Sequence, residues 1–215
     1  MNILAFDAAL SRAGVAVVSA GGMVLARQFA PGRPGLIETL PELVQSCLAK
    51  ASVPIGAVAV TIGPGSFTGL RTTIAIAQGY AAAAGVPLWG VSVAEAFEAA
   101  FPVLNRPLWV AIRARREKIF LIRNGIAESF ADADIPIIRT PVAVAGNAAN
   151  EVAALIAAAG GDVFLTSARE IDPAWVAMAA RARHAAGLAP LPAQPVYVDP
   201  PEAKLPAGGL RPAPV

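Results

Sequence analysis

A nine-residue segment, here called the signature segment, most constrains what this chain can fold into. It consists of Gly63, Pro64, Gly65, Ser66, Phe67, Thr68, Gly69, Leu70 and Arg71. It follows residues 57–62, a short apolar and β-branched run that predicts a buried strand. It precedes residues 72–84, an alanine-rich run that predicts a helix. The segment is therefore a glycine turn between a strand and a helix, with the hydroxyls of Ser66 and Thr68 as candidate helix caps. The start of such a helix attracts anions.

Two well-known phosphate-binding loops do not match this segment. The P-loop needs Gly-Lys-Ser/Thr at the helix start, and the segment contains no lysine. The dinucleotide fingerprint is Gly-x-Gly-x-x-Gly, and the last gap is one residue longer in Gly63-x-Gly65-x-x-x-Gly69. A tight turn that binds no ligand is therefore an alternative interpretation of these glycines.

The composition predicts a folded protein without a strongly basic surface. Apolar residues make up 56% of the chain and charged residues 15%, which excludes intrinsic disorder. The formal net charge is +2 without a lysine run, which argues against a stand-alone nucleic-acid-binding protein. The single cysteine, Cys47, lies at a helical spacing from other apolar residues, which predicts a buried thiol. The presence of only one cysteine excludes an intramolecular disulfide and fits a reducing compartment, so we expect a cytoplasmic protein.

No leader peptide and no membrane helix are expected. The first residues lack a basic stretch, and Asp7 interrupts their apolar run. Two long uncharged spans, 51–70 and 72–94, are divided by prolines and glycines into pieces of strand and helix size.

The chain divides into two predicted lobes, residues 1–101 and residues 102–215, and the second ends in a proline-rich tail. The first lobe has predicted strands at 2–7, 14–18, 23–29, 57–62 and 88–91, and predicted helices at 36–51, 72–84 and 93–100. The second has predicted strands at 108–112, 118–123, 142–145 and 162–165, and predicted helices at 148–159 and 172–186. This order indicates a mixed α/β protein.

The complete signature segment resembles that of the TsaB (YeaZ) family, accessory subunits of the bacterial machinery that makes threonylcarbamoyladenosine in tRNA. All nine residues match, and a weaker resemblance extends over most of the chain, including residues 195–204 near its end. The resemblance implies an α/β fold of the two-lobed actin-like type (ASKHA, ribonuclease-H-like) with a reduced second lobe. The signature would follow the fourth strand of the first lobe.

The resemblance also implies a role without catalysis. In this family the two helices of the first lobe pair with those of TsaD, the transferase that modifies the tRNA adenosine next to the anticodon. TsaE, an ATPase, binds the assembled pair. We therefore expect a non-catalytic scaffold or activating subunit with TsaD-like and TsaE-like partners, which reaches tRNA only through the complex. We expect no catalytic residue, metal ligand or required cofactor in this chain, with ATP and Mg²⁺ bound by partner subunits. The residues expected at the partner interface are Leu36, Leu40, Leu43, Val44, Thr73, Ala77 and Tyr80. Alone, the exposed helix pair is expected to favour a homodimer.

Asp7 and Arg71 are the two charged residues that the resemblance singles out. In actin-like ATPases the aspartate at the end of the first strand opens a phosphate loop, so Asp7 is a candidate for a residual nucleotide site. The family's usual Asp-Thr-Ser is Asp7-Ala8-Ala9 here, which removes two hydroxyl donors. The alternative is a strand-end aspartate that fixes the following turn. Arg71, expected in the first turn of its helix, requires a compensating anion, carboxylate or partner backbone, or else is solvated.

A basic cluster is predicted on a hairpin of the second lobe. It consists of Arg113, Arg115, Arg116, Lys118 and Arg123. Two interpretations are open: a strand edge protected by charge, and a contact with RNA phosphates or an acidic partner. The sequence departs from the family at Arg113, where an aspartate is usual, and at Gly35 and Ile37, where relatives often keep His-x-Glu.

Two other functions remain open. A stand-alone actin-like ATPase or small-molecule kinase would use Asp7 and the Gly63 loop, and would bind Mg-nucleotide by itself. An M22-type peptidase is disfavoured because His184 is the only histidine, so the His-x-x-x-His pair of the catalytic partner is absent. A serine triad would need the same histidine, on a helix face that is expected to be solvated.

Overall fold

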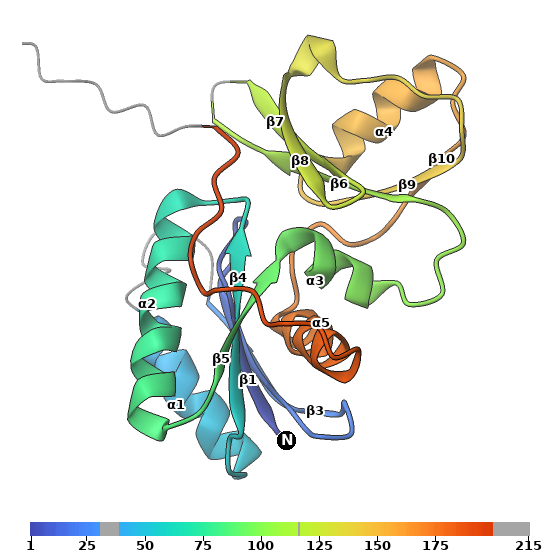
Figure 1. Cartoon of the computed structure of the whole chain (residues 1–215). Coiled ribbons are helices and arrows are strands. Elements are labelled where there is room, and N and C mark those ends of the chain that lie inside the picture. The colour runs from blue at the N-terminus through green and yellow to red at the C-terminus, as the bar shows by residue number, and fades with distance from the viewer. Residues whose placement is uncertain (31–38, 116, 200–215) are drawn as a thin grey trace, which may run out of the picture.

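Two five-stranded mixed sheets form the two lobes of the molecule (Figure 1). The computed structural model describes residues 1–30, 39–115 and 117–199. The strands of the first sheet are β1 (Ile3–Asp7), β2 (Gly14–Val18), β3 (Val24–Phe29), β4 (Ala57–Gly63) and β5 (Leu88–Ser92). Their order is β3-β2-β1-β4-β5, with three antiparallel strands followed by two parallel ones. Strands β1, β2 and β4 are buried along their whole length, as expected for apolar strands covered on both faces.

Helices cover both faces of this first sheet (Figure 1). Helices α1 (Leu40–Ala51) and α2 (Phe67–Ala84) pack on one face, α1 over β2 and β3, and α2 over β1 and β4. Helices α3 (Val93–Ala100) and α5 (Pro173–Ala185) contact each other on the other face. Helix α3 begins at Val93 as predicted, and Ser92 caps it, because the Ser92 hydroxyl accepts a hydrogen bond from the Glu95 amide at 3.2 Å.

The two helices that flank the signature segment differ from their predicted bounds. Helix α2 begins at Phe67 instead of residue 72, so most of the signature segment is helical. Helix α1 is described from Leu40, with a proline in its first turn, and the predicted start at Leu36 lies outside the described residues, as do Gly35 and Ile37. Within the described ranges, the helices are all too short or too polar to span a bilayer.

The second sheet repeats the topology of the first. Its strands are β6 (Leu108–Arg113), β7 (Lys118–Arg123), β8 (Ile126–Ala131), β9 (Val142–Ala145) and β10 (Val163–Leu165). Listed from its other edge, the order β8-β7-β6-β9-β10 again has three antiparallel strands followed by two parallel ones. Helix α4 (Ala149–Ala158) covers one face, around a core that includes Trp109, Leu121 and Ile156. The two lobes are therefore structural repeats, although the sequence shows no repeat by residue identity.

The second lobe is reduced, as predicted. Between β8 and β9 the chain forms only a 3₁₀ turn, η1 (Asp132–Asp134), where the first lobe has α1 between β3 and β4. Strand β8 was not predicted, because its half-exposed sequence IAESFA carries only a weak alternation of apolar and polar residues. It lies at the edge of the sheet, so one partner strand is enough to hold it.

The last described residues return to the first lobe, whereas the sequence places them in the second. Helix α5 buries Val176, Ala177 and Ala180 in the core of the first sheet. Beyond it, Gly90 N donates to Leu191 O and Val196 N donates to Ile62 O, both at 2.8 Å. An alanine-rich helix face carries no signal for which of two sheets it covers, so only the structure establishes this placement.

Candidate functional site

The signature segment forms a closed turn between β4 and α2. The Ser66 hydroxyl caps α2 by accepting a hydrogen bond from Gly69 N at 3.3 Å, which confirms the predicted cap. Ser66 N in turn donates to Ala9 O at 2.7 Å. Thr68 lies inside the first turn of the helix. Two amides that an anion would use at this helix start are therefore engaged by the protein itself.

Two glycines allow the segment to touch the turn that follows β1. A Cβ atom built on Gly65 would lie 2.2 Å from Ala9 O, and one on Gly69 would lie 2.1 Å from Ala8 O. Real Cβ atoms do not approach a backbone oxygen so closely, so only glycine fits at these two positions. The glycines of the signature segment thus pack backbone against backbone, and a phosphate cannot enter between the two turns.

Asp7 lies at the end of β1 beneath this contact and is 1% exposed. Its Oδ1 accepts a hydrogen bond from Ala9 N at 3.2 Å, so it fixes the following turn, as the structural alternative predicts. Burial raises the pKa of Asp7 to about 7; hydrogen bonds from Thr61 and Ala9 partly oppose this, and the charge of Glu170 adds to it. A carboxyl that is closed to solvent and half protonated at neutral pH is a poor ligand for Mg²⁺.

The positive charge of Arg71 is stabilised by contacts with aromatic side chains, which the sequence analysis did not predict. Its guanidinium carbon lies 3.8 Å from the centroid of the Phe67 ring, and its Nε donates to Tyr197 Oη at 2.9 Å. The centroids of Phe67 and Tyr197 are 5.6 Å apart. Arg71 is the fifth residue of α2, beyond the first turn, where the helix dipole opposes a cation only weakly. The resemblance marked the Tyr197 segment, but nothing in the sequence placed it beside the signature segment.

Four residues expected at a partner interface lie in the chain's own core. Leu40, Thr73 and Ala77 are fully buried and Val44 is 8% exposed, which corrects that expectation. The apolar stripe of an amphipathic helix faces the sheet that the helix covers. The sequence analysis had assigned this same stripe to the interface with a partner. Two further members of the set, Leu43 and Tyr80, are partly buried and remain accessible at the edge of the helix layer.

The exposed face of α2 carries a stripe of small residues. Ala75, Gly79 and Ala82 are exposed and follow the i, i+4, i+7 spacing of one helix face. Apart from the backbone of its own helix, no described atom lies within 4 Å of a Cβ built on Gly79. A glycine inside an exposed helix costs about 1 kcal/mol relative to alanine. The packing of the described chain gives no reason for this glycine, whereas the close approach of another helix would.

The basic hairpin is largely neutralised. Arg113 donates to Asp132 at 2.6 and 2.8 Å and to Glu151 at 3.0 Å, and Lys118 lies 3.4 Å from Asp199. Strand β7 lies between β6 and β8, so the prediction of a charge-protected strand edge is wrong for this strand. Arg115 is exposed, and Arg116 lies outside the described residues. Paired cations of this kind form no open track for a phosphate backbone.

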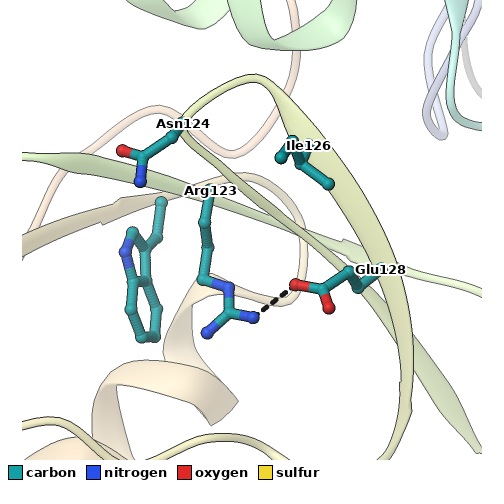
Figure 2. A pocket seen from close by; sticks show the side chains of 5 residues that line it. Arg123, Asn124, Ile126 and Glu128 are labelled. Atoms are coloured by element: carbon teal, nitrogen blue, oxygen red, sulfur yellow. Dashed lines mark hydrogen bonds and ion pairs between the residues drawn. The ribbon is translucent and has the colours of Figure 1, made fainter.

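A shallow hollow of about 350 Å³ lies beside the β7–β8 hairpin (Figure 2). Arg123 and Glu128 form an ion pair across it, and the Arg123 guanidinium carbon lies 5.3 Å from the centroid of the Trp109 ring. Ile126 and Asn124 complete its wall. Because its acid and base neutralise each other, the hollow offers no free group for chemistry.

Other nucleophilic or metal-binding chemistry finds no support in the described parts of the chain. Cys47 is fully buried as predicted, and burial raises the pKa of its thiol. His184 is exposed and stacks on Trp89 with ring centroids 5.0 Å apart. Within residues 1–30, 39–115 and 117–199, no three His, Cys, Asp or Glu side chains are grouped as a metal site.

The sequence comparisons point to tRNA modification. The chain matches the family model of TsaD, tRNA N6-adenosine threonylcarbamoyltransferase, over residues 35–170, more than half of its length. It is similar to the tRNA threonylcarbamoyladenosine biosynthesis protein TsaB of Escherichia coli K12, with 40% identity over 95 residues. That match spans 43% of this chain and 40% of the E. coli protein, so it covers less than half of the relative's length.

The structural comparisons confirm the predicted actin-like two-lobed α/β fold. A Pseudomonas aeruginosa protein described as uncharacterized, with similarity to peptidase YEAZ, aligns with a TM-score of 0.74 at 21% identity, covering 92% of this chain and 99% of that one. The activator of 2-hydroxyisocaproyl-CoA dehydratase from Clostridium difficile, solved with bound ADPNP, aligns with a TM-score of 0.52 at 8% identity, covering 87% and 97% of the two chains. At these identities the likeness concerns the fold alone.

Proposed function

The chain belongs to the TsaD family and is a TsaB/YeaZ-like member of it, and from this premise we propose that it is a non-catalytic subunit of a tRNA threonylcarbamoylation complex. The observation that carries the proposal is the contact between the signature segment and the turn after β1. Ser66 N donates to Ala9 O, and the backbones at Gly65 and Gly69 are too close for any side chain. A turn filled by its own backbone is suited to holding a scaffold together, not to binding phosphates.

The partners follow from the same proposal. A TsaD-like subunit would carry the transferase chemistry, and a TsaE-like ATPase would join the assembled pair. ATP and Mg²⁺ would bind to those subunits, and tRNA would be reached through the complex, in the cytoplasm. The pairing of Arg113 and Lys118 with carboxylates supports an indirect contact with tRNA, because it engages these two described cations of the basic hairpin within the chain itself.

The contact face on this chain would be the exposed side of α2 with the neighbouring edge of α1. Ala75, Gly79 and Ala82 leave room for a partner helix to approach closely, and Leu43 and Tyr80 add apolar area beside them. This face replaces the buried stripe that the sequence suggested. It also accounts for the presence of a glycine at a position where helix propensity alone favours alanine.

Gly79→Leu tests this face without disturbing the fold. Leucine is a better helix former than glycine, Gly79 is exposed, and a Cβ built there has no described atom outside its own helix backbone within 4 Å, so the isolated variant is expected to be at least as stable as the wild type. Against a partner helix its side chain would clash, and we expect affinity for the TsaD-like subunit to fall at least about tenfold, or ~1.4 kcal/mol. The measurement is a titration of the two purified subunits by calorimetry, with thermal unfolding of each variant alone.

Ala182→Leu is the matched control, because Ala182 is an exposed residue of α5 on the opposite face of the first sheet. It should leave the affinity unchanged. Equal affinity of Gly79→Leu and wild type would move the interface away from α2. If no complex forms under any condition and ATP raises the melting temperature of the wild-type chain, the stand-alone ATPase hypothesis replaces this one.

A further inference from the structure

The carboxylate of Glu170 fills the turn between β1 and β2. Glu170 lies between β10 and α5, where the chain passes back to the first lobe. Its Oε2 accepts hydrogen bonds from Ser11 N at 3.2 Å and from Arg12 N at 3.3 Å. Its Oε1 accepts a third from the Ser11 hydroxyl. Two successive amides and a hydroxyl of one lobe therefore converge on a single carboxylate 158 or more residues away in the sequence.

This arrangement is that of an anion-binding nest. Successive backbone N–H groups that point to one oxygen atom form a concavity with positive potential. Hydrogen bonds to an ionised oxygen are stronger than those between neutral groups. The Ser11 hydroxyl can rotate to suit any oxygen atom placed there. The donor set is thus suited to any oxyanion of carboxylate or phosphate size.

The side chain of Arg12 strengthens the positive potential of the same turn. Its guanidinium carbon lies 3.8 Å from the centroid of the Phe29 ring, and its Nη2 donates to Ile171 O at 3.5 Å. Its Nε is buried and is the one such side-chain atom in the described chain without a hydrogen-bond partner. One donor at this turn is therefore left unused when Glu170 is in place.

We propose that Glu170 is a built-in anion that occupies and closes an oxyanion site formed by the Ser11 amide and hydroxyl and the Arg12 amide. As part of the same chain, Glu170 competes with free anions at a high effective concentration. The wild-type turn is therefore closed to inorganic phosphate or sulfate. The same contact fastens residues 166–172 to the first lobe, together with the ion pair between Arg27 and Asp172. This role concerns the chain alone and is independent of partner assembly.

Glu170→Ala tests the proposal with inorganic phosphate as the probe. The substitution removes the internal anion and leaves the three donors free. At about ten times the dissociation constant of phosphate, we expect the melting temperature of the variant to rise by ~3–5 °C over a chloride control of equal ionic strength. Wild type and the control variant Glu128→Ala, which removes a carboxylate of the second lobe, should show no phosphate-specific rise. Adding Ser11→Ala to Glu170→Ala should weaken phosphate binding about tenfold, because one charge-assisted donor is lost.

Each outcome decides for or against the closed site. A folded Glu170→Ala variant that responds equally to phosphate and chloride would overturn the proposal, and so would a wild type that responds as strongly as the variant. If Glu170→Ala does not fold, Glu170→Ser, which also vacates the turn but keeps a small polar side chain, is judged by the same comparison. If neither folds in chloride, refolding in phosphate supports the site, and failure to refold there refutes it.

Discussion

Gly69→Ala is expected to lower the free energy of unfolding by about 3 kcal/mol, the upper part of the range for overpacked cores. The new methyl group would lie 2.1 Å from Ala8 O, which is a backbone atom and cannot rotate away. The clash can be relieved only if α2 moves away from the turn after β1. Buried Leu70 anchors α2 in the core, and buried Phe6 anchors β1 there. The gain in helix propensity of about 1 kcal/mol is too small to offset this clash. Urea denaturation of the purified chain measures the difference.

Gly79→Ala in the same helix is the control, with an effect of opposite sign. The added methyl group meets open space, so we expect the free energy of unfolding to rise by up to about 1 kcal/mol. Because both variants make the same substitution in the same helix, the difference between their free energies of unfolding measures the steric clash at Gly69 apart from the gain in helix propensity. If Gly69→Ala were as stable as Gly79→Ala, the close contact between the signature segment and the turn after β1 would be disproved.

The signature turn and most of the elements were predictable because local chemistry determines them. The apolar run before Gly63 and the alanine-rich run after Arg71 have only one reasonable interpretation each, a buried strand and a helix. The caps at Ser66 and Ser92 follow from side chains that satisfy nearby amides. Strand β7 and strand β9 were predicted with their observed bounds. In each case the residues that determine the element are its own neighbours in the chain.

What the sequence did not reveal depends on contacts between distant residues. The apolar faces of α1 and α2 were visible, but a pattern does not say whether such a face meets the chain's own sheet or a partner. In this protein the apolar faces of both helices pack against the chain's own sheet, as the full burial of Leu40 and Ala77 shows. The same limit hid the packing of α5 on the first sheet, the place of Tyr197 beside Arg71, and the contact of Glu170 with the β1–β2 turn. Each joins residues more than 100 positions apart, whose encounter only the tertiary structure establishes.

Asp7→Asn is expected to raise the free energy of unfolding at pH 8 by a few kcal/mol. The pKa of Asp7 rises from 3.8 to about 7 on folding, chiefly because the carboxyl is buried. Between these two values the folded state holds a proton that the unfolded state has released, so wild-type stability falls as pH rises from about 4 to about 7. Each pKa unit corresponds to about 1.4 kcal/mol, which sets an upper limit of about 4 kcal/mol for the loss. Asparagine stays neutral at every pH and keeps an acceptor for Ala9 N, so the variant avoids this loss.

The pH dependence distinguishes this effect from a simple gain in packing. The advantage of Asp7→Asn should be small near pH 4, increase up to about pH 7 and remain constant above it, as measured by urea denaturation at a series of pH values. Gly79→Ala, which removes no titratable group, should change the free energy of unfolding by the same amount at every pH. Parallel pH profiles for wild type and Asp7→Asn would contradict the burial of a protonatable carboxyl.

The same variant bears on function, because a metal ligand does not survive replacement by a neutral amide without loss of activity. A complex with the TsaD-like subunit that modifies tRNA normally with Asp7→Asn would therefore show that Asp7 serves the fold.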